Sequence, residues 1–115
     1  MTNFDVEYHD EIVAVALPGR VDVSNTRGFI DVVQAEVDKE RIHFVLDFEK
    51  TEAIDSTALG AIVQVYKTLR TRSGSLRLCA VGSGVRRVLA ITRVDRVFPI
   101  DDTLSEALIA TAALI

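Results

Sequence analysis

The stretch Ala53-Ile54-Asp55-Ser56-Thr57-Ala58-Leu59-Gly60-Ala61-Ile62 decides the fold of this chain. It follows an apolar run at residues 44–48 and opens a segment in which apolar residues recur with helical spacing. Asp55 and Ser56 therefore lie where a strand has ended and a helix begins. A short polar side chain at this place caps the free N–H groups of the first helical turn. Residue chemistry alone leaves three roles open for Ser56: a helix cap, a nucleophile or a phosphate acceptor.

Strands are predicted on both sides of this stretch. An alternation of apolar and polar residues is followed by a continuous apolar run that Pro18-Gly19 ends, which predicts an antiparallel edge hairpin. Continuous apolar runs further on predict buried parallel strands, and a proline in the last short run indicates an edge. The predicted strands are residues 4–8, 12–17, 42–48, 76–81 and 97–100.

Helices are predicted between and after these strands. The first is capped by Ser24, Asn25 or Thr26, has Glu36 on its outer face and is closed by the basic end at residues 39–41. The second begins at the Asp55-Ser56 stretch, and Gly74 stops it. Ser83 caps the third, and Thr103 with Glu106 forms the capping box of the fourth. In the fourth helix, the Thr111 hydroxyl is expected to bond a carbonyl one turn earlier.

The order of these segments predicts an α/β fold. Alternating strands and helices give a mostly parallel mixed β-sheet, with an N-terminal antiparallel edge strand and about four helices packed on it. With 115 residues and no linker or repeat, residues 1–115 are expected to form a single domain.

Composition limits the classes of partner. A net charge of −4 gives no electrostatic attraction to nucleic acid or to an anionic membrane. The lone Cys79 lies in an apolar run, which favours a buried thiol in a reducing compartment. No apolar stretch approaches the ~20 residues of a membrane helix. No signal peptide is expected, because residues 1–5 lack a basic start and an apolar run. A soluble protein of the cytoplasm, without direct contact to nucleic acid or membrane, is expected.

A site is expected at the carboxyl edge of the parallel strands, where such sheets bind their ligands. The loops at residues 18–25, 49–55 and 82–83 meet there, as does the loop after Ile100. Asp22, Asp55 and Ser56 should therefore lie at the same end of the sheet.

Catalysis by Ser56 is not supported by the other residues. A serine nucleophile needs a base, and His9 lies in the hairpin turn while His43 begins a strand at the far end of the sheet. The two histidines and one cysteine show no metal-ligand spacing, and no phosphate-binding loop is present. Asp47 lies near a strand end, but the acids and lysine of a phosphoryl-accepting receiver domain are missing. No enzymatic activity, cofactor or metal is therefore expected, and Ser56 is left as a helix cap or as a residue that another enzyme phosphorylates.

Four blocks of the sequence match, in order, the pattern of a known family. Residues 55–60 read Asp-Ser-Thr-Ala-Leu-Gly, against a family signature Asp-Ser-Ser/Thr-Gly/Ala-Leu-Gly. Residues 17–22 match a Leu-x-Gly-Glu-Leu-Asp segment, with Arg20 in place of its acidic residue. Residues 75–91 match a strand, small turn and helix, and residues 93–101 with 106–108 match a terminal strand and helix. Nearly the whole chain thus resembles STAS domains, and in particular the bacterial anti-sigma factor antagonists.

The resemblance implies a protein that binds an anti-sigma factor and so frees a sigma factor for transcription, for example in a stress response. It implies that the anti-sigma factor is also a serine kinase, that phosphorylation of Ser56 switches the antagonist off, and that a serine phosphatase restores it. A monomer or weak homodimer is expected. The residues expected to bind the partner are Asp22, Asp55, Ser56, Thr57, Ala58, Leu59 and Ser83.

Two other functions remain open at this point. A STAS domain without phosphorylation could serve as a scaffold in a stress-sensing assembly or as a subunit of a transport complex. A nucleotide-binding or phosphoryl-relay enzyme is the other alternative.

Overall fold

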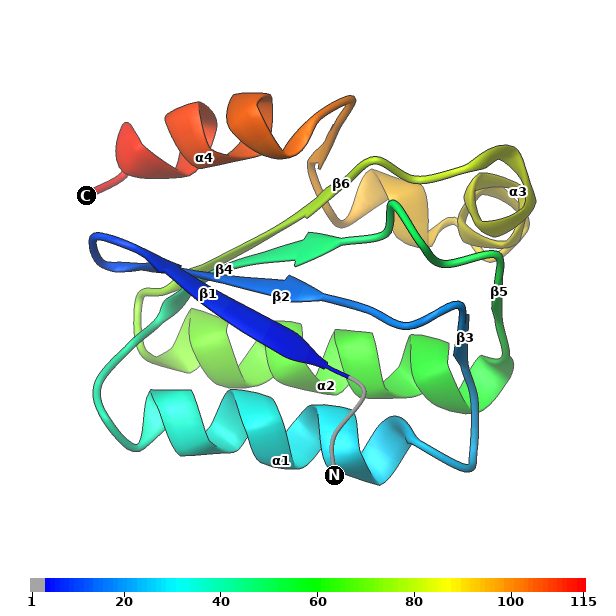
Figure 1. Ribbon diagram of the computed structural model, residues 1–115, viewed down its shortest axis with the longest axis horizontal. Coiled ribbons are helices and arrows are strands. Elements are labelled where there is room, and N and C mark those ends of the chain that lie inside the picture. Colours follow the sequence, from blue (N-terminus) through cyan, green and yellow to red (C-terminus); the bar gives the residue numbers. More distant parts are fainter. Residues whose placement is uncertain (1–3) are drawn as a thin grey trace.

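The computed structural model of the protein describes residues 4–115 (Figure 1). Within these residues no helix is both long and apolar enough to cross a membrane. In chain order the elements are β1 Asp5–His9, β2 Ile12–Ala16, β3 Arg20–Val21, α1 Thr26–Val37, β4 His43–Asp47, β5 Ala53–Ile54, α2 Ser56–Thr71, β6 Ser75–Cys79, α3 Ser83–Ile91, the 3-10 helix η1 Val94–Arg96, β7 Ile100–Asp101 and α4 Leu104–Ala112.

Five strands form the main sheet, in the order β1-β2-β4-β6-β7. β1 pairs with β2 in the antiparallel sense, and every other pair is parallel. The predicted class is therefore confirmed: a mostly parallel mixed sheet with an antiparallel edge strand and four helices.

Helices cover both faces of the sheet. Figure 1 shows α1 and α2 on one face and α4 on the other, with α3 at the end where β3 and β5 lie. In β4, Phe44 and Leu46 belong to the larger core on the α1–α2 side, whereas Val45 belongs to the smaller core beneath α4. Both faces of the strand are buried, which explains the continuous apolar run. Burying one such side chain contributes about 1.5–3 kcal/mol.

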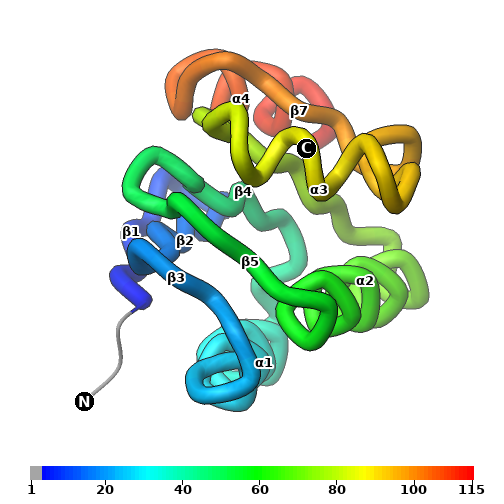
Figure 2. The backbone as a smooth tube through the Cα atoms, turned by 90° about the vertical axis from the view of Figure 1, so that its right-hand side faces the viewer, coloured from blue at the N-terminus to red at the C-terminus, as the bar shows by residue number. Residues whose placement is uncertain are grey.

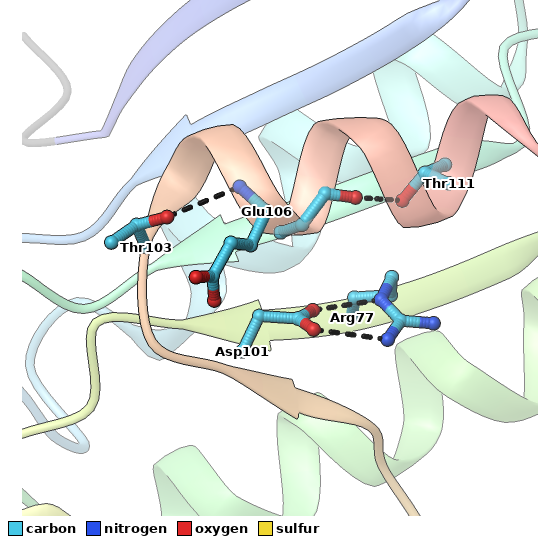
Figure 3. A network of polar contacts seen from close by, with 6 residues as sticks. Arg77, Asp101, Thr103, Glu106 and Thr111 are labelled. Carbon is cyan, nitrogen blue, oxygen red and sulfur yellow. Dashed lines mark hydrogen bonds and ion pairs between the residues drawn. The ribbon is translucent and has the colours of Figure 1, made fainter.

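Polar contacts hold α4 and the edge strand β7 (Figure 3). The Glu106 N–H donates to Thr103 Oγ1 at 3.1 Å, which is one of the two hydrogen bonds of the predicted capping box. The buried Thr111 hydroxyl donates to the Ala107 carbonyl at 2.8 Å, as also predicted. Arg77 on β6 donates two hydrogen bonds, of 2.8 and 3.1 Å, to Asp101 on β7. This bidentate pair ties a two-residue edge strand to the sheet.

Two strand predictions need correction. The expected strand at residues 97–100 begins only at Ile100, because the chain before it coils into η1 and buries Phe98. The Phe98 ring meets Tyr66 edge-on, with ring centroids 5.0 Å apart. In addition, β3 and β5 form a separate two-stranded parallel sheet where only loops were expected.

The end of α1 also differs from the prediction. Glu36 was expected to face water, yet it is only 6% exposed. The Tyr8 hydroxyl donates to Glu36 Oε2 at 2.7 Å, and Arg41 Nε lies 3.8 Å from Glu36 Oε1. Residues 39–41 close α1 through their backbone, because the Lys39 and Arg41 N–H groups donate to the Glu36 carbonyl and the Glu40 N–H donates to the Val37 carbonyl. The last turn of the helix itself contains no basic residue. Arg41 instead turns back over the Tyr8 ring, 4.5 Å from its centroid.

Gly74 follows α2 as expected, but for a different physical reason. Ser73, and not the glycine, adopts the left-handed conformation, with φ of 61°. A Cβ at Gly74 would lie 2.1 Å from the Ile42 carbonyl oxygen. A glycine is required here because two backbone segments approach closely.

Candidate functional site

The small β3–β5 sheet joins the loops at the carboxyl edge of the main sheet. The Glu52 N–H donates to the Gly19 carbonyl at 2.7 Å, and the Asp55 N–H donates to the Val21 carbonyl at 3.2 Å. Figure 2 shows β3 and β5 side by side, with α3 on the same side of the molecule. We call this region, formed by β3, β5, the loop at residues 22–25 and the starts of α2 and α3, the Ser56 end. As predicted, it contains both Asp22 and Asp55.

Asp55 holds two parts of the Ser56 end together. Its side chain caps α2, because Oδ1 accepts the Ala58 N–H at 2.8 Å. Its second oxygen, Oδ2, accepts the N–H of Val23 at 3.1 Å. One carboxylate therefore fixes the helix start and the loop that follows β3. This geometry makes Asp55 a supporting residue of the site.

Ser56 is the first residue of α2 and is exposed to solvent. Its hydroxyl makes no hydrogen bond within the described part of the chain, since Asp55 provides the cap. Thr57 beside it is also exposed. The helix dipole favours negative charge at this place. The arrangement leaves an accessible hydroxyl that the fold does not use.

The next two residues of the signature face the opposite way. Ala58 is fully buried and Leu59 is 9% exposed, and both belong to the larger core. They were expected to bind the partner, but their side chains pack against the sheet. Their positions in the first turn of α2 place them on its inner face.

Asp22 organises the loop before α1. Its Oδ1 accepts the Ser24 N–H at 2.9 Å and the Ser24 hydroxyl at 2.5 Å. These two hydrogen bonds hold the pKa of the Asp22 carboxyl below its ordinary value, and the bond from the hydroxyl has the larger effect. The Asp22 N–H donates to Asn25 Oδ1, so Asn25 braces the loop and does not cap α1 with its side chain. The Thr26 hydroxyl donates to the Asp22 carbonyl, which fixes the loop to the helix.

Ser83 lies at the Ser56 end but does not act as the predicted cap. α3 begins at Ser83 itself, and the preceding Gly82 makes no side-chain cap. The backbone of α3 comes close to the residue before β5, as a Cβ added at Gly84 would lie 3.3 Å from the Glu52 carbonyl oxygen. The Ser83 side chain remains exposed.

Sequence reasoning missed Val23. Its side chain is 75% exposed, although it is aliphatic and its backbone is held by Asp55. In the sequence, Val23 is an apolar residue between Asp22 and Ser24 in a polar loop. This position could have indicated an exposed contact residue. A fixed, exposed aliphatic group next to Ser56 is suited to contact a protein partner.

The potentially reactive side chains elsewhere lie away from Ser56 or are inert. His43 pairs with Ser75 Oγ at 2.8 Å at the opposite ends of β4 and β6, so neither can act on Ser56. Burial raises the pKa of the Cys79 thiol to about 12, and the nearby Asp47 and Asp101 carboxylates add to the shift. Among residues 4–115, no group of three or more His, Cys, Asp or Glu side chains is placed to hold a metal ion.

Comparisons with known proteins identify the family. Residues 3–107 match the STAS domain. A Thermotoga neapolitana protein with the provisional name anti-sigma factor antagonist is 35% identical over 100 residues, which is 85% of this chain and 88% of that protein. The anti-sigma F factor antagonist of Paenibacillus polymyxa is 28% identical over 90% of both chains. The crystal structure of a Thermotoga maritima protein, also provisionally named an anti-sigma factor antagonist, superimposes with a TM-score of 0.88 at 31% identity, covering 95% of this chain and 94% of that one. The chain therefore belongs to the STAS domain family.

Proposed function

We propose that this protein is an anti-sigma factor antagonist that phosphorylation of Ser56 switches off. It binds an anti-sigma factor and so releases a sigma factor for transcription. The observation that carries the proposal is the Ser56 hydroxyl, which is exposed and unbonded at the start of α2. The names of relatives that match most of the chain support the partner class.

The docking surface is formed by the accessible side chains of the Ser56 end. Ala58 and Leu59 contribute from inside, by holding the first turn of α2 against the sheet. The side chains that face the partner are Asp22, Val23, Asp55, Ser56, Thr57 and Ser83.

Phosphorylation blocks docking locally and leaves the fold intact. A phosphate adds about −1.5 to −2 charge, and a helix N-terminus stabilises such a charge by roughly 0.3–1 kcal/mol. Asp22, Glu52 and Asp55 are on the same end of the molecule, so they oppose that gain and make the surface densely negative. A partner that buries Ser56 would enclose an unpaired charge, at a cost of several kcal/mol. The effect on binding therefore exceeds the effect on stability.

The chain itself is the substrate of this switch and performs no catalysis. The anti-sigma factor acts as the serine kinase with ATP, and a serine phosphatase reverses the modification. A single STAS domain that exchanges partners with the transcription apparatus works in the cytoplasm, as a monomer or weak homodimer.

A kinase assay tests the proposal. The protein is incubated with ATP and an anti-sigma factor kinase purified from the same organism, and phosphate is located by mass spectrometry. We expect one phosphate, on Ser56, in the wild type and in Thr57→Ala. Ser56→Ala should stay folded and remain unmodified.

Thr57→Ala is the matched control, because Thr57 is the neighbouring exposed hydroxyl in the same helical turn. Phosphate on Thr57, or full modification of Ser56→Ala, would contradict the role of Ser56. Failure of the kinases of the organism to bind or modify the wild type would contradict the function itself.

A further inference from the structure

The helix α3 and the turn η1 present a face that no other part of the described chain covers. Val85 and Leu89 are the buried residues of α3. Ser83, Arg87 and Ile91 follow one another at intervals of four residues on the opposite side, so they form an outward stripe. Ile91 is 74% exposed, although it is a large aliphatic residue.

This face is basic in an acidic protein. Residues 83–97 contain four arginines and one aspartate, so they carry +3 while the whole chain carries −4. The arginines are Arg86, Arg87, Arg93 and Arg96, and all four are exposed.

The arginines of this face are unpaired, unlike most others in the chain. Within residues 4–115, none of the four makes a side-chain hydrogen bond or ion pair. Elsewhere, Arg27, Arg41 and Arg77 each pair with a carboxylate, and Arg70 donates to the Tyr66 hydroxyl. The fold does not use the charges on α3 and η1, so they are available to an anionic partner.

Apolar groups lie within the same face. Val97, just after η1, is 46% exposed and joins Ile91 as an exposed aliphatic residue of this segment. Aliphatic side chains among arginines fit a protein segment that has both carboxylates and an apolar residue. A polyanion such as duplex DNA or an anionic bilayer fits less well, because Asp22, Glu52 and Asp55 at the adjoining Ser56 end would repel it.

The basic face continues into the Ser56 end. α3 starts beside β5, and both views of the molecule place α3 at the end where β3 and β5 lie (Figures 1 and 2). One protein that covers Ser56 can therefore also reach Ser83, Arg87 and Ile91.

We propose that the α3–η1 face is a second docking surface for the same anti-sigma factor, and that it binds an acidic segment of that partner carrying an aliphatic residue. The inference rests on the proposed function, since it takes its partner from there. It adds the chemistry of the partner segment and the residues that select it. Arg87 and Ile91 are the central contacts.

Binding of the purified anti-sigma factor kinase to single variants tests this surface. We expect Arg87→Glu and Ile91→Asp each to weaken binding at least tenfold. Arg87→Glu should also lower the salt dependence of binding and raise the KM for phosphorylation of Ser56 without changing kcat. All variants are first compared with the wild type by thermal unfolding.

Two matched controls lie elsewhere on the molecule. Arg72→Glu makes the same charge change at an exposed arginine after α2, and Ile109→Asp makes the same apolar-to-acid change at a 72% exposed residue of α4. Both should bind within about twofold of the wild type. A folded wild type that binds no anti-sigma factor would overturn the proposed function and this inference with it.

Other outcomes overturn the inference alone. If Arg87→Glu and Ile91→Asp bound the anti-sigma factor as tightly as the wild type does, the α3–η1 face would take no part in binding. Equal losses in the two controls would show a general charge effect. The wild type could also bind duplex DNA or phosphatidylserine vesicles. If Arg87→Glu abolished that binding but left anti-sigma factor binding unchanged, the face would be assigned to a polyanion.

Discussion

The two ends of the sheet use their polar groups differently. At the end where the parallel strands begin, which we call the closed end, side chains pair with one another: Tyr8 donates to Glu36, and His43 pairs with Ser75. Arg41 lies 3.8 Å from Glu36 Oε1, a buried oxygen that accepts no hydrogen bond within the described residues. At the Ser56 end, two carboxylates and the backbone hold the loops, and the hydroxyl of Ser56 is left unused. A functional surface is therefore expected at the Ser56 end, where a rigid backbone carries side chains that the fold does not require.

The largest effect on stability is expected from Gly74→Ala, at the closed end of the sheet, where the parallel strands begin. The added Cβ would lie 2.1 Å from the Ile42 carbonyl oxygen, so the two backbone segments must move apart. We expect the free energy of unfolding to fall by about 3 kcal/mol, measured by urea denaturation.

Gly60→Ala is the matched control on α2, where a new Cβ meets nothing within 4 Å. Because alanine favours the helix, this variant should gain up to about 1 kcal/mol. Equal effects of the two substitutions would disprove the close approach at Gly74.

At the Ser56 end, Asp55→Ala should lower the free energy of unfolding by about 1–2 kcal/mol, because α2 loses its cap and Val23 loses its N–H acceptor. Ser56→Ala should change it by less than about 0.5 kcal/mol. Amide hydrogen exchange at Val23 should rise in Asp55→Ala only. If Ser56→Ala proved as destabilising as Asp55→Ala, Ser56 would be the structural cap.

The Ser56 end should respond to acid through Asp22. The pKa of its carboxyl is lower in the folded protein than in the unfolded chain, so ionised Asp22 stabilises the fold above the unfolded value near 3.8. This contribution is lost as pH falls through the lower folded pKa. Wild type should therefore lose more stability than Asp22→Asn between about pH 6 and pH 2, as followed by urea denaturation. If the free energy of unfolding of the two proteins fell equally with pH, the hydrogen bonds from Ser24 to Asp22 would be contradicted.

The closed end should respond to alkali through Tyr8. Its hydrogen bond to Glu36 raises the pKa of the phenol above 10.0, so the neutral form stabilises the fold below pH 10. That contribution disappears as pH rises from 10 through the folded pKa. We expect Tyr8→Phe to lose less stability than the wild type above pH 10, as measured by urea denaturation. An identical loss in both proteins would place the Tyr8 hydroxyl in water.

Much of the fold follows from local patterns in the sequence. Apolar runs predicted the buried strands, and the hairpin and the α4 cap were also correct. β3 and β5 were missed because two residues are too short to show a period. Glu36 was placed in water because helical spacing does not reveal contacts from Tyr8 and Arg41, which come from other elements.

The site was predicted less completely than the fold. The signature placed Asp55 and Ser56 at the helix start, where the structure has them. Helical spacing placed Leu59 on the face that packs against the sheet, and the structure buries it there, but the burial of Ala58 was missed. The exposure of Val23 depends on the acceptor that Asp55 provides across the β3–β5 sheet, and sequence spacing does not contain that contact.

The most direct test of the account is a titration of the purified anti-sigma factor with unmodified and with Ser56-phosphorylated protein, followed by calorimetry and amide spectra. The account predicts that phosphorylation weakens binding by about a hundredfold or more, equivalent to ~3 kcal/mol. It also predicts that amide resonances of α2 beyond the first turn stay in place. Equal affinity of the two forms, or widespread loss of α2 on phosphorylation, would contradict it.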